Sequence, residues 1–109
     1  MLTKDVIVKG NIAIALFMGW RIDNSFPDKG RVYRLGGRLE LDTTFKFHQS
    51  WDALMPCVIK CESYIYVKDT ICPLYGKIFR ALNDIDLTRL WMAVVYFVEN
   101  YEKQLQINK

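Results

Sequence analysis

The chain has 109 residues, of which 51% are hydrophobic and 25% are charged. This length and composition exclude a disordered or fibrous protein and predict one domain, residues 1–109, with a core of its own. Fifteen basic and twelve acidic side chains give a net charge of +3, an excess too small for a dedicated DNA-binding domain.

The N-terminal segment predicts no export signal and no membrane anchor. Residues 1–10 contain lysines but no apolar run followed by a cleavage site, and the apolar stretch Ile12–Trp20 is too short to cross a bilayer. Three cysteines, an odd number, fit a reducing compartment better than a disulfide framework. We therefore expect a cytoplasmic protein without a membrane partner.

The first predicted elements are a helix and a loop. Apolar residues at helical spacing predict a helix over Asn11–Trp20, with Asn11 as its N-cap. The next segment, Arg21–Gly30, is rich in Asp, Asn, Ser, Pro and Gly, which favour turns. We expect this segment to be a surface loop.

Alternating apolar residues then predict strands. The adjacent pair Gly36 and Gly37 supplies the positive φ values of a tight turn, so Arg31–Leu41 is expected to form a β-hairpin. Asp42–Thr44 is expected to turn the chain into a short third strand that carries Phe45 and Phe47.

A second helix is predicted over Trp51–Ser63, with Ser50 as its N-cap and Asp52 near the positive end of the helix dipole. Pro56 lies inside this range, where it removes a backbone donor and clashes with the preceding turn. We expect either a bend at Pro56 or a helix that begins late.

The remaining residues predict a strand, a turn and a long helix. Tyr64–Lys68 alternates as a strand does, Asp69–Pro73 favours a turn, and Leu74–Asn83 fits a strand or a helix. Asp86 is expected to cap a helix whose apolar stripe runs from Leu87 to Leu105. The whole pattern predicts an α+β fold in which helices sandwich or cover a small antiparallel sheet.

Three segments resemble a known group of proteins. They are Phe17-Met18-Gly19-Trp20, the segment Phe47–Pro56 (FHQSWDALMP) and the segment Trp91–Tyr101 (WMAVVYFVENY). On these residues the chain resembles uncharacterised phage and prophage proteins of Bacteroidetes and is more distantly similar to the phage ABA sandwich domain. The resemblance implies a phage origin, a bacterial host cell and an α+β fold, but no activity.

Basic and aromatic side chains around the hairpin predict a ligand-binding surface. Arginine forks bind phosphates through paired hydrogen bonds, and aromatic rings stack on bases. The alternative is a solvated strand surface balanced by Glu40 and Asp42. The candidate ligand-binding residues are Arg21, Arg31, Tyr33, Arg34, Arg38, His48 and Trp51, with Lys46 among the neighbouring basic residues.

Catalytic and metal chemistry have weaker support. Cys57, Cys61, Cys72 and His48 are zinc-ligand types, but their spacing favours cysteines that act as small buried hydrophobes. His48 with Ser50 and Asp52 resembles a hydrolytic triad, although cap and dipole roles explain the last two. We expect no metal and no cofactor.

Three functional hypotheses follow. The first is a non-enzymatic phage accessory protein that binds a small anionic, nucleotide-like ligand or a host protein and thereby counteracts host defence. The second is a small hydrolase that uses His48. The third is a homo-oligomeric interaction protein whose interface is the aromatic last helix.

Overall fold

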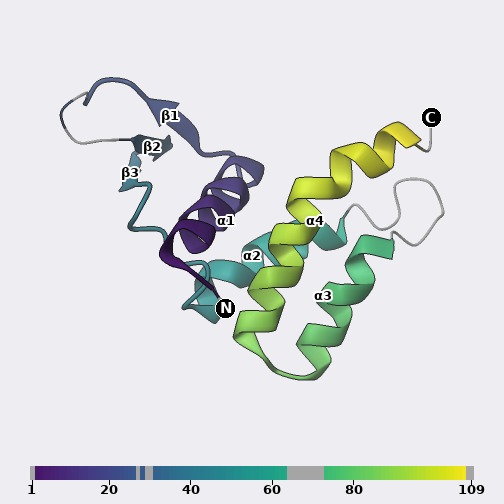
Figure 1. The fold of residues 1–109 in the computed structure, drawn as a ribbon. Coiled ribbons are helices and arrows are strands. Elements are labelled where there is room, and N and C mark those ends of the chain that lie inside the picture. The colour runs from purple at the N-terminus through teal and green to yellow at the C-terminus, as the bar shows by residue number, and fades with distance from the viewer. Residues whose placement is uncertain (1, 27, 29–30, 64–72, 108–109) are drawn as a thin grey trace.

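The computed structural model describes residues 2–26, 28, 31–63 and 73–107. Helices and an antiparallel three-stranded sheet together form an α+β fold, as predicted (Figure 1). In chain order the elements are α1 (Lys4–Phe17), β1 (Arg21–Asp23), β2 (Val32–Leu35), β3 (Arg38–Leu41), α2 (Trp51–Glu62), α3 (Pro73–Asn83) and α4 (Leu87–Ile107).

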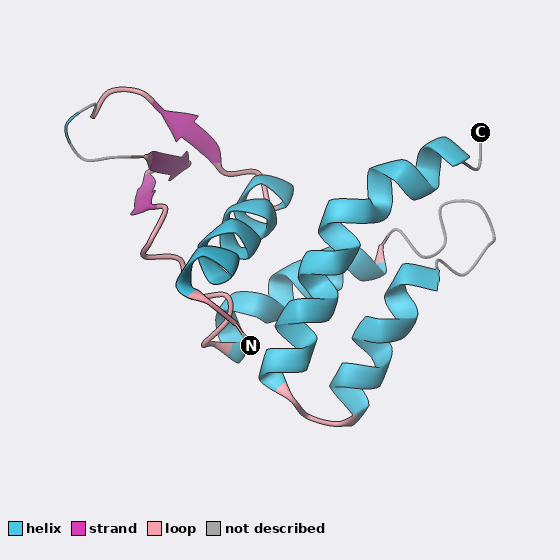
Figure 2. Ribbon diagram, in the orientation of Figure 1, coloured by secondary structure: helices cyan, strands magenta, loops and turns pink. Residues whose placement is uncertain are grey.

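The long helix α4 organises the helical part of the molecule. It contacts α1, α2 and α3, while the sheet lies to one side, next to α1 (Figure 2). Its N-cap is Asp86, whose Oδ1 accepts a hydrogen bond of 3.0 Å from the Arg89 backbone, as predicted. The segment Leu74–Asn83, which the sequence assigned to a strand or a helix, is helical and forms most of α3.

Helix α1 begins earlier than predicted. Its N-cap is Thr3, whose hydroxyl accepts a hydrogen bond of 3.2 Å from the Val6 backbone. The predicted cap, Asn11, is wrong: it lies in the middle of the helix and only 2% of it is exposed. The helix ends before Gly19, whose φ of +101° suits a residue without a Cβ.

The sheet has the order β1-β2-β3 and contains the predicted hairpin. Its turn includes Gly36 at a φ of +58°, and Leu35 pairs with Arg38 beside it. The partner on the other side of β2 is β1, which corrects the prediction that Arg21–Gly30 is all loop. The three residues of β1 have a weak sequence signal for a strand, and pairing with β2 holds them in an extended conformation.

The predicted third strand at Phe45–Phe47 does not form. The Phe45 backbone carbonyl accepts a hydrogen bond from the Asn11 side chain, at 3.0 Å, instead of one from a neighbouring strand. The Phe45 ring packs edge-on against Trp20 and Tyr33, at centroid distances of 5.2 and 5.6 Å. Both phenylalanines turn inward because this aromatic cluster joins the sheet to α1.

Helix α2 begins at Trp51 with Ser50 as its N-cap, as predicted, because the Ser50 hydroxyl accepts a hydrogen bond of 3.2 Å from the Ala53 backbone. The helix continues through Pro56, so the expected late start is wrong. The strand predicted at Tyr64–Lys68 and most of the turn predicted at Asp69–Pro73 lie outside the described residues.

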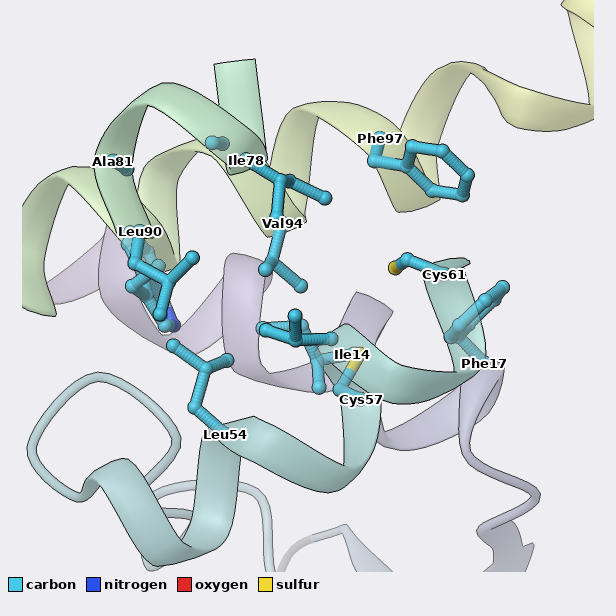
Figure 3. Close-up of a cluster of buried hydrophobic side chains, with 13 residues drawn as sticks. Ile14, Phe17, Leu54, Cys57, Cys61, Ile78, Ala81, Leu90, Val94 and Phe97 are labelled. Carbon is cyan, nitrogen blue, oxygen red and sulfur yellow. The ribbon is translucent and has the colours of Figure 1, made fainter. Parts of the chain in front are cut away.

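Side chains from all four helices meet in one core (Figure 3). Cys57 and Cys61 of α2 are fully buried there as free thiols. The hydrogen bond with Cys57 and burial raise the pKa of the Cys61 thiol, so it stays protonated and packs as a small hydrophobe. In the described part of the chain, no group of three His, Cys, Asp or Glu side chains could hold a metal ion.

None of the helices within the described ranges combines the length and apolar character needed to span a membrane.

Candidate functional site

The sheet register divides the predicted ligand-binding residues between two faces. Residues paired directly across an antiparallel sheet point to the same side, and neighbours along a strand alternate. Arg21 pairs with Arg34, so these two share one face. Tyr33 and Arg38 lie on the opposite face, since Leu35 pairs with Arg38. The hairpin therefore presents no single cationic surface.

The two arginines on the first face already have partners within the chain. Arg34 Nε lies 2.7 Å from Asp23 Oδ2. Hydrogen bonds from Ser25 and from Arg34 lower the pKa of Asp23 to about 2. Arg21 Nη1 donates to the Trp20 carbonyl at 2.9 Å, close to the end of α1. The Arg21 guanidinium is held near the end of α1, and the Arg34 guanidinium links β2 to β1, which makes both poor phosphate ligands.

The predicted aromatic residues are largely used in packing. Only 1% of Tyr33 is exposed, so its ring cannot stack on a base at the surface. Trp51 is half-buried and packs against the helical core. Arg31 is exposed just before β2, and its carbonyl accepts a hydrogen bond from Asp42. Of the seven predicted residues, Arg38 lines a concave surface that the hairpin shares with the start of α2.

His48 belongs to a buried hydrogen-bond network. Trp91 Nε1 can only donate, and it donates to Asn11 Oδ1 at 2.8 Å. This fixes the orientation of the Asn11 amide, whose two N–H groups point to the Phe45 carbonyl and to His48 Nδ1, both at 3.0 Å. Nδ1 must therefore accept, and His48 is neutral with its proton on Nε2. Burial also lowers the pKa of His48.

The proposed triad residues have separate roles. His48 Nδ1, the atom that a triad carboxylate would orient, is bound by Asn11. The Ser50 hydroxyl caps α2, and Asp52 is exposed in the first turn of that helix. Among the described residues, no hydrogen bond links Ser50 or Asp52 to His48.

A different concave surface emerges between the hairpin and the start of α2, and we call it the hairpin hollow. Its volume is about 680 Å³. It is formed by residues just after α1, by Leu35 at the end of β2, by β3 with the loop that follows it, and by the first turns of α2. The residues that line it are Met18, Trp20, Leu35, Arg38, Glu40, Thr44, Phe45, Lys46, Phe47, Asp52, Ala53 and Pro56.

The hairpin hollow has an apolar floor and charges of both signs. The Arg38 guanidinium lies 5.8 Å from the centroid of the Trp20 ring, within the range of a cation–π contact. Glu40 is held in place by Thr44, whose hydroxyl donates to its carboxylate at 2.6 Å. Lys46 and Asp52 are exposed and add one further charge of each sign.

Most of the hollow was not predictable from sequence patterns. Arg38 and Lys46 were expected near a ligand, but Glu40 was expected only to balance charge, and Asp52 was expected near the positive end of the helix dipole or in a triad with His48. Phe45 and Phe47 were assigned to a strand. These residues come together because of the path of the loop after β3. That path is fixed by Asn11 and by the aromatic cluster, which bring in contacts from distant parts of the chain.

Comparisons of the chain with protein-family models, with curated proteins and with solved structures found no significant match. The site geometry therefore carries the functional conclusion.

Proposed function

We propose that this chain is a binding protein without catalytic activity, a phage accessory protein that holds a segment of a bacterial host protein in the hairpin hollow and thereby counteracts host defence. The observation that carries the proposal is the combination of an apolar floor with two cations and two carboxylates in one open concavity. A polypeptide can satisfy both signs of charge and the apolar surface together, as protein interfaces commonly do.

The roles of the Ser50 and His48 side chains favour binding over hydrolysis. Ser50 caps a helix, and His48 is tied to Asn11 through the nitrogen that a catalytic carboxylate would need. On the last helix, the interface of the oligomer hypothesis, Trp91 and Phe97 lie in the core, where at most 1% of either is exposed, whereas Tyr96 is 42% exposed. The hydrolase hypothesis gains no support from this arrangement.

Site-specific photocross-linking tests the proposal. A photoreactive phenylalanine analogue at Lys46, which is exposed in the hollow, is expected to capture a host protein from a lysate of the bacterial host. The same analogue at Asn24, exposed in the turn after β1, is the control and should capture nothing. Excess unlabelled protein should compete with capture at Lys46. Equal products from both positions would contradict the proposal.

Charge reversal at one cation and at one carboxylate of the hollow identifies the class of ligand. A polypeptide that complements both signs should bind more weakly after Arg38→Glu and also after Asp52→Lys, each by about three- to tenfold. If both substitutions leave the cross-linked product unchanged, the hollow is not the binding surface.

The exposed Arg38 guanidinium in the hollow favours a second candidate, a small anionic ligand such as a nucleotide. A guanidinium can bind a phosphate through paired hydrogen bonds. In this case Arg38→Glu should weaken binding, whereas Asp52→Lys should strengthen it, because it removes a repulsive carboxylate. A thermal-shift screen of linear and cyclic nucleotides measures both effects, since a ligand that binds the folded state raises the melting temperature.

A further inference from the structure

A second groove lies on the opposite part of the molecule, between α3 and α4, which run side by side (Figure 1). Its volume is about 350 Å³. The lining residues of α4 are spaced i, i+3, i+4 and i+7, and those of the other wall keep the same spacing to one residue past the end of α3, so each wall is about two turns, or roughly 10 Å, long. They are Lys77, Arg80 and Ala81 on α3, Asp84 just after α3, and Arg89, Met92, Ala93 and Tyr96 on α4.

The groove exists because its floor is built from alanines. Ala81 and Ala93 are 4% and 6% exposed, and their single methyl groups leave the space between the helices unfilled. Met92 and Tyr96 border this floor and are 50% and 42% exposed, so they add apolar surface beside the two alanines. The result is an apolar groove that is open to solvent.

The rim of the groove is cationic. Arg89 lies 3.5 Å from Asp84, so these two charges neutralise each other. Lys77 and Arg80 have no carboxylate within ion-pair distance in the described part of the chain. The Lys77 ammonium instead lies 4.1 Å from the centroid of the Tyr96 ring. Two uncompensated positive charges therefore flank the apolar floor on the α3 side.

We propose that this groove docks an amphipathic helix of a partner protein, with acidic side chains beside its apolar stripe. A third helix can lay its apolar side chains over the two alanines and against Met92 and Tyr96, since two adjacent helices form the groove that helix-in-groove recognition uses. Its carboxylates then lie toward Lys77 and Arg80. This surface shares no residue with the hairpin hollow, so the two proposals stand or fall separately.

Other anionic partners fit the groove less well. Nucleic-acid phosphates need several donors, whereas the floor consists of methyl groups, a thioether and an aromatic ring. An anionic lipid surface is flat and cannot follow a channel between two helices. An acidic helix satisfies the apolar floor and the cationic rim together.

The probe is a fluorescent 18-residue helical peptide made of Leu, Ala and Glu, with Leu at i, i+3, i+4 and i+7 and Glu on both flanks. A matched peptide replaces every Glu with Lys. Fluorescence anisotropy against the full chain should show that the Glu peptide binds at least about tenfold more tightly than the Lys peptide. Equal affinities would overturn the proposal.

A charge-reversed variant tests the site itself. Lys77→Glu combined with Arg80→Glu changes two exposed side chains and should weaken binding of the Glu peptide by about tenfold while strengthening binding of the Lys peptide. The matched control, Lys4→Glu with Lys9→Glu on exposed positions of α1, makes the same change in net charge and should alter affinity less than twofold. Circular dichroism checks that both variants fold.

Three further results would overturn the proposal. One is an equal loss of affinity in the control variant, which would show that net charge alone attracts the peptide. Another is self-association of the unmodified chain in light scattering that the Lys77→Glu, Arg80→Glu variant abolishes, which would assign the groove to a second copy. The third is binding to phosphatidylserine vesicles that the same variant abolishes while the Glu peptide fails to bind.

Discussion

Asn11 Oδ1 accepts a hydrogen bond of 2.8 Å from Trp91 Nε1, although 80 residues separate the two in the chain. The contact joins α1 to α4 inside the molecule, where Asn11 is 2% and Trp91 is 1% exposed. Through its amide, Asn11 also holds the loop after β3, since it donates to the Phe45 carbonyl and to His48. One buried side chain thus ties the helical core to the hairpin hollow.

Replacing Asn11 with Leu should destabilise the protein strongly. The substitution keeps the side-chain size but leaves the Trp91 indole N–H and the Phe45 carbonyl buried without partners. We expect the free energy of unfolding to fall by about 2–4 kcal/mol, measured by urea denaturation. Asn24→Ala, on an exposed turn, is the control and should change it by less than about 0.5 kcal/mol. A similar effect at both positions would contradict the network.

Stability should depend on pH through His48, which is the single histidine of the chain. Burial lowers the pKa of His48 below its usual 6.5, so the unfolded state binds more protons once the pH falls below about 6.5. The contribution of neutral His48 is complete above that pH and is lost as the pH falls through the lower folded-state pKa. Urea unfolding at pH 7.5, 6.5 and 5.5 should therefore show decreasing stability.

The His48→Gln variant separates this effect from other titrations, because a glutamine oxygen can still accept the Asn11 hydrogen bond without binding a proton. Its stability should change less over the same pH range. Parallel pH profiles for the wild type and His48→Gln would exclude the role of His48.

The Asp23 carboxylate affects stability in a lower pH range. Its folded-state pKa of about 2 means that its contribution to stability is complete above pH 3.8 and is lost toward pH 2.

Gly10 should not tolerate a side chain. A Cβ at this position would lie 2.4 Å from Trp91 Cζ2 and 2.6 Å from Cη2, and the indole cannot move away without breaking its bond to Asn11. Gly10→Ala should lower the free energy of unfolding by about 1–2 kcal/mol, because overpacking outweighs the higher helix propensity of alanine.

The matched control for Gly10→Ala is Gly76→Ala in α3. Among the described residues, no atom outside its chain neighbours and its own helix backbone lies within 4 Å of a Cβ built at Gly76, so only helix propensity changes there. This variant should gain about 0.5–1 kcal/mol of stability. Thermal unfolding that moves in the same direction for both variants would contradict the close contact of α1 and α4.

Ile85 is strained, and relieving the strain should stabilise the protein. It has a φ of 51° in the turn between α3 and α4, a conformation that costs a β-branched residue about 1–2 kcal/mol. Its side chain is 79% exposed, so little packing is lost on removal. Ile85→Gly should gain about 0.5–1 kcal/mol after the entropy cost of glycine. Ile85→Val keeps the branched Cβ and should gain nothing, and a gain for valine would place the effect elsewhere.

Local signals in the sequence were sufficient for several elements. The hairpin follows from Gly36 and Gly37, α2 from the Ser50 cap, and α4 from the Asp86 cap with the apolar stripe behind it. In each case the residues that determine the structure lie within a few positions of one another. Turn preferences and capping hydrogen bonds act over that range, so they can be predicted before the fold is known.

Long-range contacts decided the remaining features. Strand β1 forms because β2 lies beside it, and Asn11 looks like a helix cap until α4 brings Trp91 against it. The pairing of β1 with β2 placed Arg21 opposite Arg34, which the hairpin alone does not determine. The sequence by itself determined the hairpin, α2 and α4, since those depend on neighbouring residues. Only the tertiary structure decided which side chains share a surface, because that depends on which distant segments pack together.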